Sequence, residues 1–140
     1  MKCDVIVTYC WNRVGYNIIR SLYEKGLKVV VGDTSSYNIC SVSKFSVGKF
    51  VYRDFKTDEQ GFIEDLKKAI KDFSPKVLMP THDEALIIAK HIDELPKDVI
   101  YTMESYEKQV LLSDKHQATI LSDIVGVPIP RFIEDIKQAT

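Results

Sequence analysis

Few cysteines and no long hydrophobic run limit the classes of protein to which this chain can belong. Its 140 residues include three cysteines, Cys3, Cys10 and Cys40, and no CxxC pair. An odd number of cysteines without paired spacing argues against a disulfide framework or a zinc site, so we expect reduced thiols and a cytoplasmic protein. No apolar run approaches the ~20 residues that span a bilayer. The N-terminus shows no h-region or cleavage site of a secretory signal.

The chain also has no excess of charge of either sign. Its formal net charge is −1, with 28% charged and 45% hydrophobic residues. Such a balance predicts no strong attraction to nucleic acid or to an anionic membrane, so we expect neither as a partner. The length and composition are sufficient for a globular domain with a hydrophobic core.

What the sequence does have is an alternation of short β-branched runs with amphipathic segments. The pattern predicts strands at residues 3–8, 27–31, 49–52, 76–79 and 99–102. It predicts one helix at 14–25 and a second that begins at a Thr57/Gln60 capping box and ends at Phe73. Further helices are predicted at 84–91, 105–112, 115–125 and 133–139. Alternating strands and helices favour an α/β fold with parallel pairing and right-handed crossovers. We therefore expect a Rossmann-like three-layer domain with a mostly parallel sheet of about four or five strands.

The turn after the first strand lacks the GxGxxG sequence that brings a backbone close to a pyrophosphate. Trp11 and Arg13 would crowd that space, so a dinucleotide and a nicotinamide-dependent oxidoreductase are disfavoured. Asn12 and Arg13 could instead bind an anion at the start of the helix. The alternative is that Trp11 packs as a lid or interface residue and Arg13 is a solvated charge. Asp33, after the second strand, is more typical of a turn than of a ribose site here.

The turn after the strand at 76–79 carries Thr81, His82, Asp83 and Glu84. In an open parallel sheet, ligands bind beyond the carboxyl ends of the strands, which places this turn at a candidate site. A histidine can act there as acid, base or ligand. The alternative is that Thr81 and Glu84 form a capping box and that Asp83 interacts with the helix dipole. One histidine with two carboxylates is too few for a metal site, and we assign no catalytic residue.

Two helical segments carry the remaining candidates. Asp114 is the expected N-cap of the helix that follows it. Lys115 is unfavourable for the helix dipole in that position, so it is either held for an anion or is an ordinary surface lysine. His91 and His116 lie on predicted helices, where a solvent-facing or hydrogen-bonded histidine is the simpler interpretation.

Three segments in order carry a resemblance to a known family: VGYNIIRSLYEKGLKVVVGD, KVLMPTHDEALIIAKH and SDKHQATILSDIVGVPIPRF. The third is the most specific, because an Asp-Lys pair, Asp114-Lys115, opens a helix that a Gly-Val-Pro-Ile-Pro turn at 126–130 follows. The whole chain resembles the N-terminal (pre-ATP-grasp) domain of ATP-grasp enzymes, in the carbamoyl-phosphate-synthase-like or carboxylate–amine ligase branch.

The resemblance implies a domain at residues 1–112 and linker helices at 113–140 that lead toward an ATP-grasp domain. It implies that Lys115 contacts an ATP phosphate. It also implies that Asn12, Arg13 and the turn Thr81, His82, Asp83 and Glu84 border the substrate cleft. Enzymes of this kind use ATP and Mg²⁺ to activate a carboxylate as an acyl phosphate, which an amine then attacks, and later domains supply most of the phosphate and magnesium contacts.

The resemblance also implies that these 140 residues are not active alone. We expect a missing ATP-grasp domain in cis or a partner chain in trans. The expected substrates are a small-molecule carboxylate and an amine, and a homodimer is possible. The first turn reads CWNR where relatives often have glycines, which weakens a phosphate role for it. The alternative is a stand-alone Rossmann-like binding or regulatory module for a small anion or a protein partner. An exposed apolar patch would favour the first interpretation.

Overall fold

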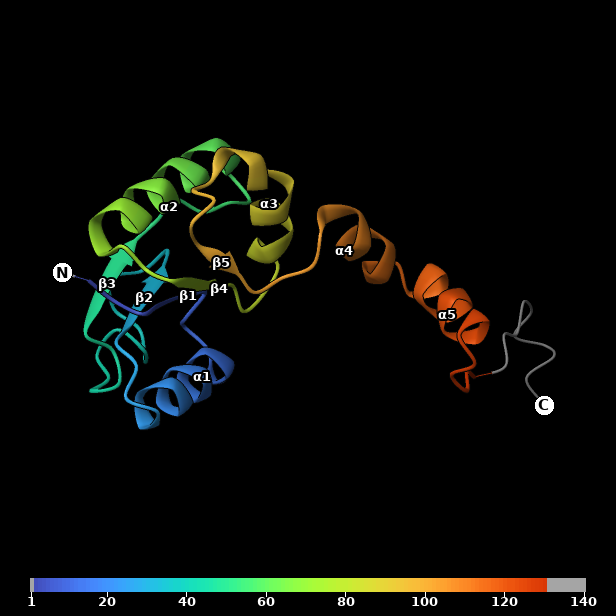
Figure 1. The fold of residues 1–140 in the computed structure, drawn as a ribbon, viewed down its shortest axis with the longest axis horizontal. Helices are drawn as coiled ribbons and strands as arrows, with labels where there is room; N and C mark the ends of the chain where they lie inside the picture. Colours follow the sequence, from blue (N-terminus) through green and yellow to red (C-terminus); the bar gives the residue numbers. More distant parts are fainter. Residues whose placement is uncertain (1, 131–140) are drawn as a thin grey trace. The chain divides into compact units, whose positions relative to one another are not determined.

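A computed structural model describes residues 2–130 and divides the chain into two compact units, with the boundary in the sequence between Ser105 and Tyr106. The first unit holds a five-stranded sheet in the order β3-β2-β1-β4-β5 (Figure 1). All four neighbouring pairs are parallel. The strands are β1 (Val5–Thr8), β2 (Val29–Asp33), β3 (Gly48–Val51), β4 (Val77–Met79) and β5 (Ile100–Tyr101).

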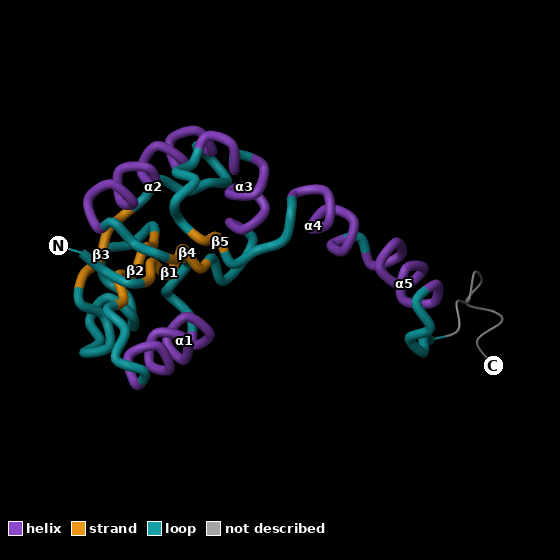
Figure 2. The backbone as a smooth tube through the Cα atoms, in the orientation of Figure 1, coloured by secondary structure: helices purple, strands orange, loops and turns teal. Residues whose placement is uncertain are grey.

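Helices cover both faces of this sheet, as Figure 2 shows. Helix α1 (Arg13–Glu24) lies on one face, and α2 (Glu59–Phe73) and α3 (Glu84–Lys90) lie on the other, followed by the short 3₁₀ helix η1 (Ile92–Glu94). The expected three-layer α/β fold with a parallel sheet is confirmed.

Two hydrophobic cores explain why the central strands read as continuous apolar runs. Ile6 and Leu78 pack with the apolar face of α2 in one core, whereas Val7 and Val31 pack with Ile19 of α1 in the other. Every residue of β1 and β2 is buried. Strands covered on both faces do not alternate between apolar and polar residues.

The helix ends follow local chemistry, with one correction to the sequence prediction. Helix α1 is followed by Gly26, whose φ of 79° is the left-handed conformation expected after a helix C-terminus. Helix α2 does not begin with a Thr57 capping box. Its N-cap is Asp58, whose side chain accepts a hydrogen bond from the Gly61 amide at 2.9 Å, while the Thr57 hydroxyl donates to the Asp54 carbonyl.

The second unit contains α4 (Tyr106–Ser113) and α5 (Lys115–Ile124). No residue of either helix is buried. The helix expected at 133–139 lies outside the described residues. Across residues 2–130, no helix is both long enough and apolar enough to cross a membrane.

Candidate functional site

The direction of strand order changes between β1 and β4, at the centre of the sheet. From β1 the chain proceeds to β2 on one side, and it later returns to β4 on the other. Parallel pairing of β1 with β4 ends at Val7 and Met79. The turns that follow, residues 9–12 and 80–83, leave adjacent strands at the carboxyl edge of the sheet. This is the topological switch point, where open α/β sheets bind their ligands.

A buried carboxylate joins the two strands at this point. Glu84 has no exposed surface, and its Oε1 accepts hydrogen bonds from the Thr8 hydroxyl at 2.7 Å and from the Thr81 amide at 2.9 Å. The Thr81 hydroxyl in turn donates to the carbonyl oxygens of Thr8 and Tyr9, at 2.9 and 3.3 Å. We call Thr8, Thr81 and Glu84 the interstrand lock. Glu84 Oε2 is buried without a hydrogen-bond partner.

An aromatic group stands directly beyond the lock. Tyr9 adopts a left-handed backbone conformation, with φ of 57°, and its amide donates to the Tyr52 hydroxyl oxygen at 3.1 Å. The ring of His82 stacks on Tyr9 with centroids 4.6 Å apart and planes 17° apart. Trp11 meets Tyr9 edge-on at 6.0 Å and is 58% exposed. The two turns therefore contact each other through their side chains as well as through the lock.

The start of α1 places Asn12 and Arg13 in different roles. Asn12 is the N-cap, and its Oδ1 accepts a hydrogen bond from the Gly15 amide at 2.9 Å. Arg13 is exposed, and its guanidinium forms no hydrogen bond or ion pair with any residue in the range 2–130. The guanidinium is thus available to an anion at the end of the first strand.

The other acidic candidates differ in exposure. Asp83 is exposed and lies 3.4 Å from the Nδ1 atom of His82, and its side chain forms no cap on α3. Asp33 is not an exposed turn residue, because it is the last residue of β2 and is buried. Its Oδ1 accepts weak hydrogen bonds from Thr34 and Ser35, and its Oδ2 has no partner.

Two buried cysteines, Cys10 and Cys40, pack beneath the turn that follows β1. Cys10 donates its thiol to the Val7 carbonyl at 3.2 Å. A hydrogen bond with Cys40 and burial both raise the pKa of Cys10 far above that of a free thiol. Cys3, Cys10 and Cys40 are all free and buried. They serve as packing residues in this structure.

His91 is hydrogen-bonded, which was one of the two interpretations open from the sequence. Its ring nitrogens lie 2.6 Å from carboxylate oxygens of Glu94 and Glu59. These two carboxylates raise the pKa of His91. Lys67 and Lys90 complete an ion-pair network that joins α2 to the last residue of α3 and to η1.

Lys115 lies in the second unit, at the first residue of α5. Asp114 caps that helix as expected, accepting hydrogen bonds from the amides of His116 and Gln117 at 2.8 and 3.1 Å. Lys115 lines an open groove of about 430 Å³ together with Leu112, Ala118, Thr119, Ser122 and residues 127–130. Asp114 therefore occupies two of the amides at the start of α5.

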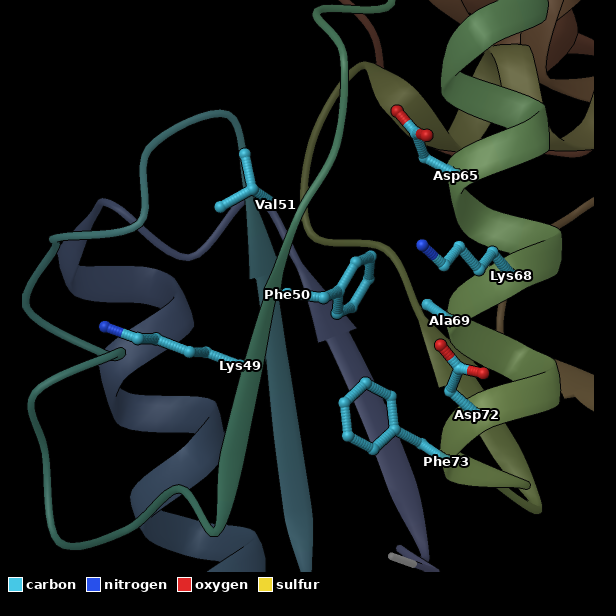
Figure 3. A pocket seen from close by; sticks show the side chains of 8 residues that line it. All are labelled: Lys49, Phe50, Val51, Asp65, Lys68, Ala69, Asp72 and Phe73. Carbon is cyan, nitrogen blue, oxygen red and sulfur yellow. The ribbon is translucent and has the colours of Figure 1, made fainter.

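A second groove of about 320 Å³ lies between the edge strand β3 and α2 (Figure 3). Phe50 and Phe73 form its apolar part, and Lys49, Lys68, Asp65 and Asp72 supply charges of both signs. Asp65 is already bonded to Arg53. The Lys49 ammonium is engaged as well, because it donates to the Ser36 carbonyl at 2.7 Å. Open α/β sheets bind their ligands at the topological switch point, so that point remains the candidate site.

The residues that the sequence did not single out are Thr8, Tyr9 and Tyr52. Thr8 is linked to Glu84 over 76 positions, and Tyr9 to Tyr52 over 43 positions. None of them belongs to a recognisable motif. Only the strand order brings them to the turns that the sequence did identify.

No protein-family model matches the sequence, and no curated protein matches it. Solved structures do resemble this one. An L-amino acid ligase from Bacillus licheniformis has a TM-score of 0.67 at 16% identity, over 96% of this chain and 33% of the ligase chain. A complete multifunctional pyruvate carboxylase from Rhizobium etli has a TM-score of 0.64 at 14% identity, over 96% of this chain and 13% of that one.

A third resemblance is to the biotin carboxylase domain of the Hydrogenobacter thermophilus 2-oxoglutarate carboxylase, in complex with MgADP, ADP and bicarbonate. Its TM-score is 0.60 at 16% identity, over 99% of this chain and 32% of that one. This chain therefore spans about a third or less of the length of these three proteins. At such identities the likeness establishes the fold. The chain has the fold of the N-terminal part of ATP-grasp carboxylases and ligases, as the resemblance in the sequence predicted.

Proposed function

We propose that this chain is the N-terminal substrate-cleft domain of an ATP-grasp ligase, which activates a carboxylate as an acyl phosphate for attack by an amine. The observation that carries the proposal is the match of nearly the whole chain to one third of an L-amino acid ligase. In this proposal the turns at 9–13 and 81–84 border the substrate, and the domains that bind most of the ATP lie in cis or in a partner chain.

The geometry of the switch point supports a role in binding a carboxylate. Arg13 presents an unpaired guanidinium next to the start of α1, where helix amides favour negative charge. A guanidinium can donate two parallel hydrogen bonds to the two oxygens of a carboxylate. His82 and Asp83 lie on the other side of the same switch point. This chain's contribution would be to orient the substrate, and proximity of reactants accounts for a large part of such catalysis.

Among residues 2–130, we assign one contact with ATP, at Lys115. The ammonium of Lys115 would neutralise charge on an ATP phosphate. Within residues 2–130, no group of three His, Cys, Asp or Glu side chains could hold a metal ion. In this proposal the Mg²⁺ ligands belong to the additional domain, as the family resemblance implies. When bound, Mg-ATP supplies the phosphoryl group that activates the carboxylate.

The second unit supports the idea that this chain works within a larger assembly. Eight apolar side chains of residues 106–130 are exposed: Val110, Leu111, Leu112, Ile120, Leu121, Ile124, Val125 and Val127. So many exposed apolar groups are unusual on a monomeric protein and mark a surface that another structure covers. A further domain or a partner chain would cover them.

The proposal is tested by assaying ATP-dependent ligation on the native gene product, after its intact mass has been measured. Arg13→Ala should raise the KM for the carboxylate by about 10- to 100-fold, because a hydrogen bond to a charged group is worth ~1.5–3 kcal/mol. The matched control is Arg20→Ala on the same helix, where the arginine forms an exposed ion pair with Glu24. Equal kinetics for the two variants would remove Arg13 from the site. No ATP-dependent ligation with any carboxylate and amine would refute the function itself.

A further inference from the structure

Three unfavourable features adjoin one another at the carboxyl end of β1. Glu84 is a fully buried carboxylate with one unpartnered oxygen. Tyr9 holds a left-handed conformation that non-glycine residues avoid. His82 keeps its exposed ring stacked on Tyr9 rather than free in solvent. Buried unpaired polar atoms and strained backbone are retained mostly where a site needs fixed geometry.

We propose that Glu84 is a positioning residue. Its carboxylate fixes the separation of the turns at 9–12 and 80–83, and it thereby holds the imidazole of His82 over Tyr9 at the switch point. Glu84 has no exposed surface with which to touch a substrate, so it acts through His82. The positioning role of Glu84 rests on the proposed function only for the identity of the ligand bound at the switch point. The geometry that Glu84 fixes does not depend on that function.

The interstrand lock holds the two turns together beyond the end of the β1–β4 pairing. Backbone pairing between β1 and β4 stops at Val7 and Met79, one residue before Thr8. From there the interstrand lock replaces the ladder, with Glu84 Oε1 accepting from Thr8 at 2.7 Å and from Thr81 at 2.9 Å. A single oxygen atom thus connects both strands. The turns cannot separate without breaking the buried Thr8–Glu84 hydrogen bond and the partly buried hydrogen bonds of Thr81.

The second step leads from the lock to the imidazole. Thr81 directly precedes His82, and both its amide and its hydroxyl are engaged in the lock. On the opposite side, the Tyr52 hydroxyl oxygen holds the Tyr9 amide at 3.1 Å. The His82 ring then has one stacking partner in a fixed place, 4.6 Å away. The position of the imidazole is therefore set by Glu84, which holds Thr81, and by Tyr52, which holds Tyr9.

The test is nuclear magnetic resonance of the 140-residue chain, with the His82 signals assigned by their loss in His82→Gln. The stack predicts an upfield ring-current shift of the His82 ring protons and a nuclear Overhauser effect to Tyr9. Glu84→Leu should lose both signals while the amides of β1 and β2 keep their dispersion. Glu84→Gln is the rescue variant, because its carbonyl oxygen can accept the same two hydrogen bonds, and it should keep both signals.

The proposal is overturned if folded Glu84→Leu retains the wild-type His82 shift and the contact to Tyr9. It is also overturned if Glu84→Gln loses them as Glu84→Leu does. Should Glu84→Leu not fold, Thr8→Val decides, because it removes one donor of the lock and keeps the shape of the side chain. An unchanged His82 signal in Thr8→Val then overturns the proposal, and a loss of the shift supports it. The measurement needs no substrate, so its failure leaves the ligase proposal standing, and absent ligation leaves the positioning role standing.

Discussion

The substitution Gly32→Ala tests how tightly the side chain of Phe50, on β3, packs against β2. Gly32 lies near the end of β2, in register with Thr8 of β1 and Phe50 of β3. A Cβ atom at this position would overlap the Cζ atom of Phe50 and would lie 2.6 Å from its Cε1 atom. Carbon atoms in contact prefer about 3.5–4.0 Å, so in Gly32→Ala the ring must move by about 1 Å.

Movement of the Phe50 ring disturbs its packing against two aromatic neighbours. Its centroid lies 5.9 Å from that of Tyr52 and 6.3 Å from that of Phe73, and Figure 3 shows Phe50 and Phe73 together between β3 and α2. Overpacking of this kind costs about 1–3 kcal/mol. For a unit of about 100 residues, each kcal/mol lowers Tm by about 4 °C, so Gly32→Ala should lose about 4–12 °C.

Thermal unfolding followed by circular dichroism measures this loss, and Phe50→Leu identifies its cause. Leucine is shorter than phenylalanine, so in the Phe50→Leu background the added methyl group should cost less than half as much. A double-mutant cycle over Gly32 and Phe50 gives the coupling directly. A wild-type Tm for Gly32→Ala would refute the reasoning, and an equal loss in both backgrounds would show that Phe50 is not what the methyl group meets.

Two further predictions concern the helices around the site. The raised pKa of His91 means that its stabilising charge is complete below its ordinary pKa of about 6.5 and is lost as pH rises through the raised value. His91→Gln should therefore lower Tm more in mild acid than at alkaline pH, and equal losses at both would contradict the role of Glu59 and Glu94. Asn12→Ala removes the N-cap of α1 and should cost ~1 kcal/mol in denaturant unfolding. Its control, Asn17→Ala, changes an exposed position of the same helix and should cost far less.

Much of the fold could be predicted because the signals are local. Five short β-branched runs and the amphipathic segments between them correspond to the five strands and to helices α1 to α5. The apolar runs at 3–8 and 27–31 predicted two strands, and the strands that form there, β1 and β2, are fully buried. Hydrophobic periodicity reports burial directly, which is why it identifies elements well.

The errors arose where two neighbouring residues compete for one role. Thr57 and Asp58 can each cap a helix, and both precede a run of apolar residues at helical spacing. The structure uses Asp58, because its carboxylate reaches the Gly61 amide. Asp33 was similarly interpreted as a turn residue after Gly32, although pairing of β2 with β3 continues to Asp33. Neither choice is encoded in the spacing of residue types.

The sequence predicted which turns form the candidate site, but it did not predict the contacts between them. Parallel strands place their carboxyl ends at one edge, so Asn12 and His82 could be assigned to the same edge from the sequence. That these two turns are neighbours depends on β1 pairing with β4, which no local pattern specifies. The roles of Thr8, Tyr9 and Tyr52 follow from that pairing alone.

The sequence T-x-x-E at 81–84 forms one of the two hydrogen bonds of a capping box, but its side chains also link two strands. Glu84 does accept a hydrogen bond from the Thr81 amide, as one half of a capping box requires. The other half is absent, because the Thr81 hydroxyl donates to the carbonyl oxygens of Thr8 and Tyr9 instead of capping α3. An exposed capping box would leave the glutamate in solvent, whereas here Glu84 is completely buried and also binds Thr8. The same residues that begin a helix therefore join two strands, and burial of the glutamate is the property that distinguishes the two uses.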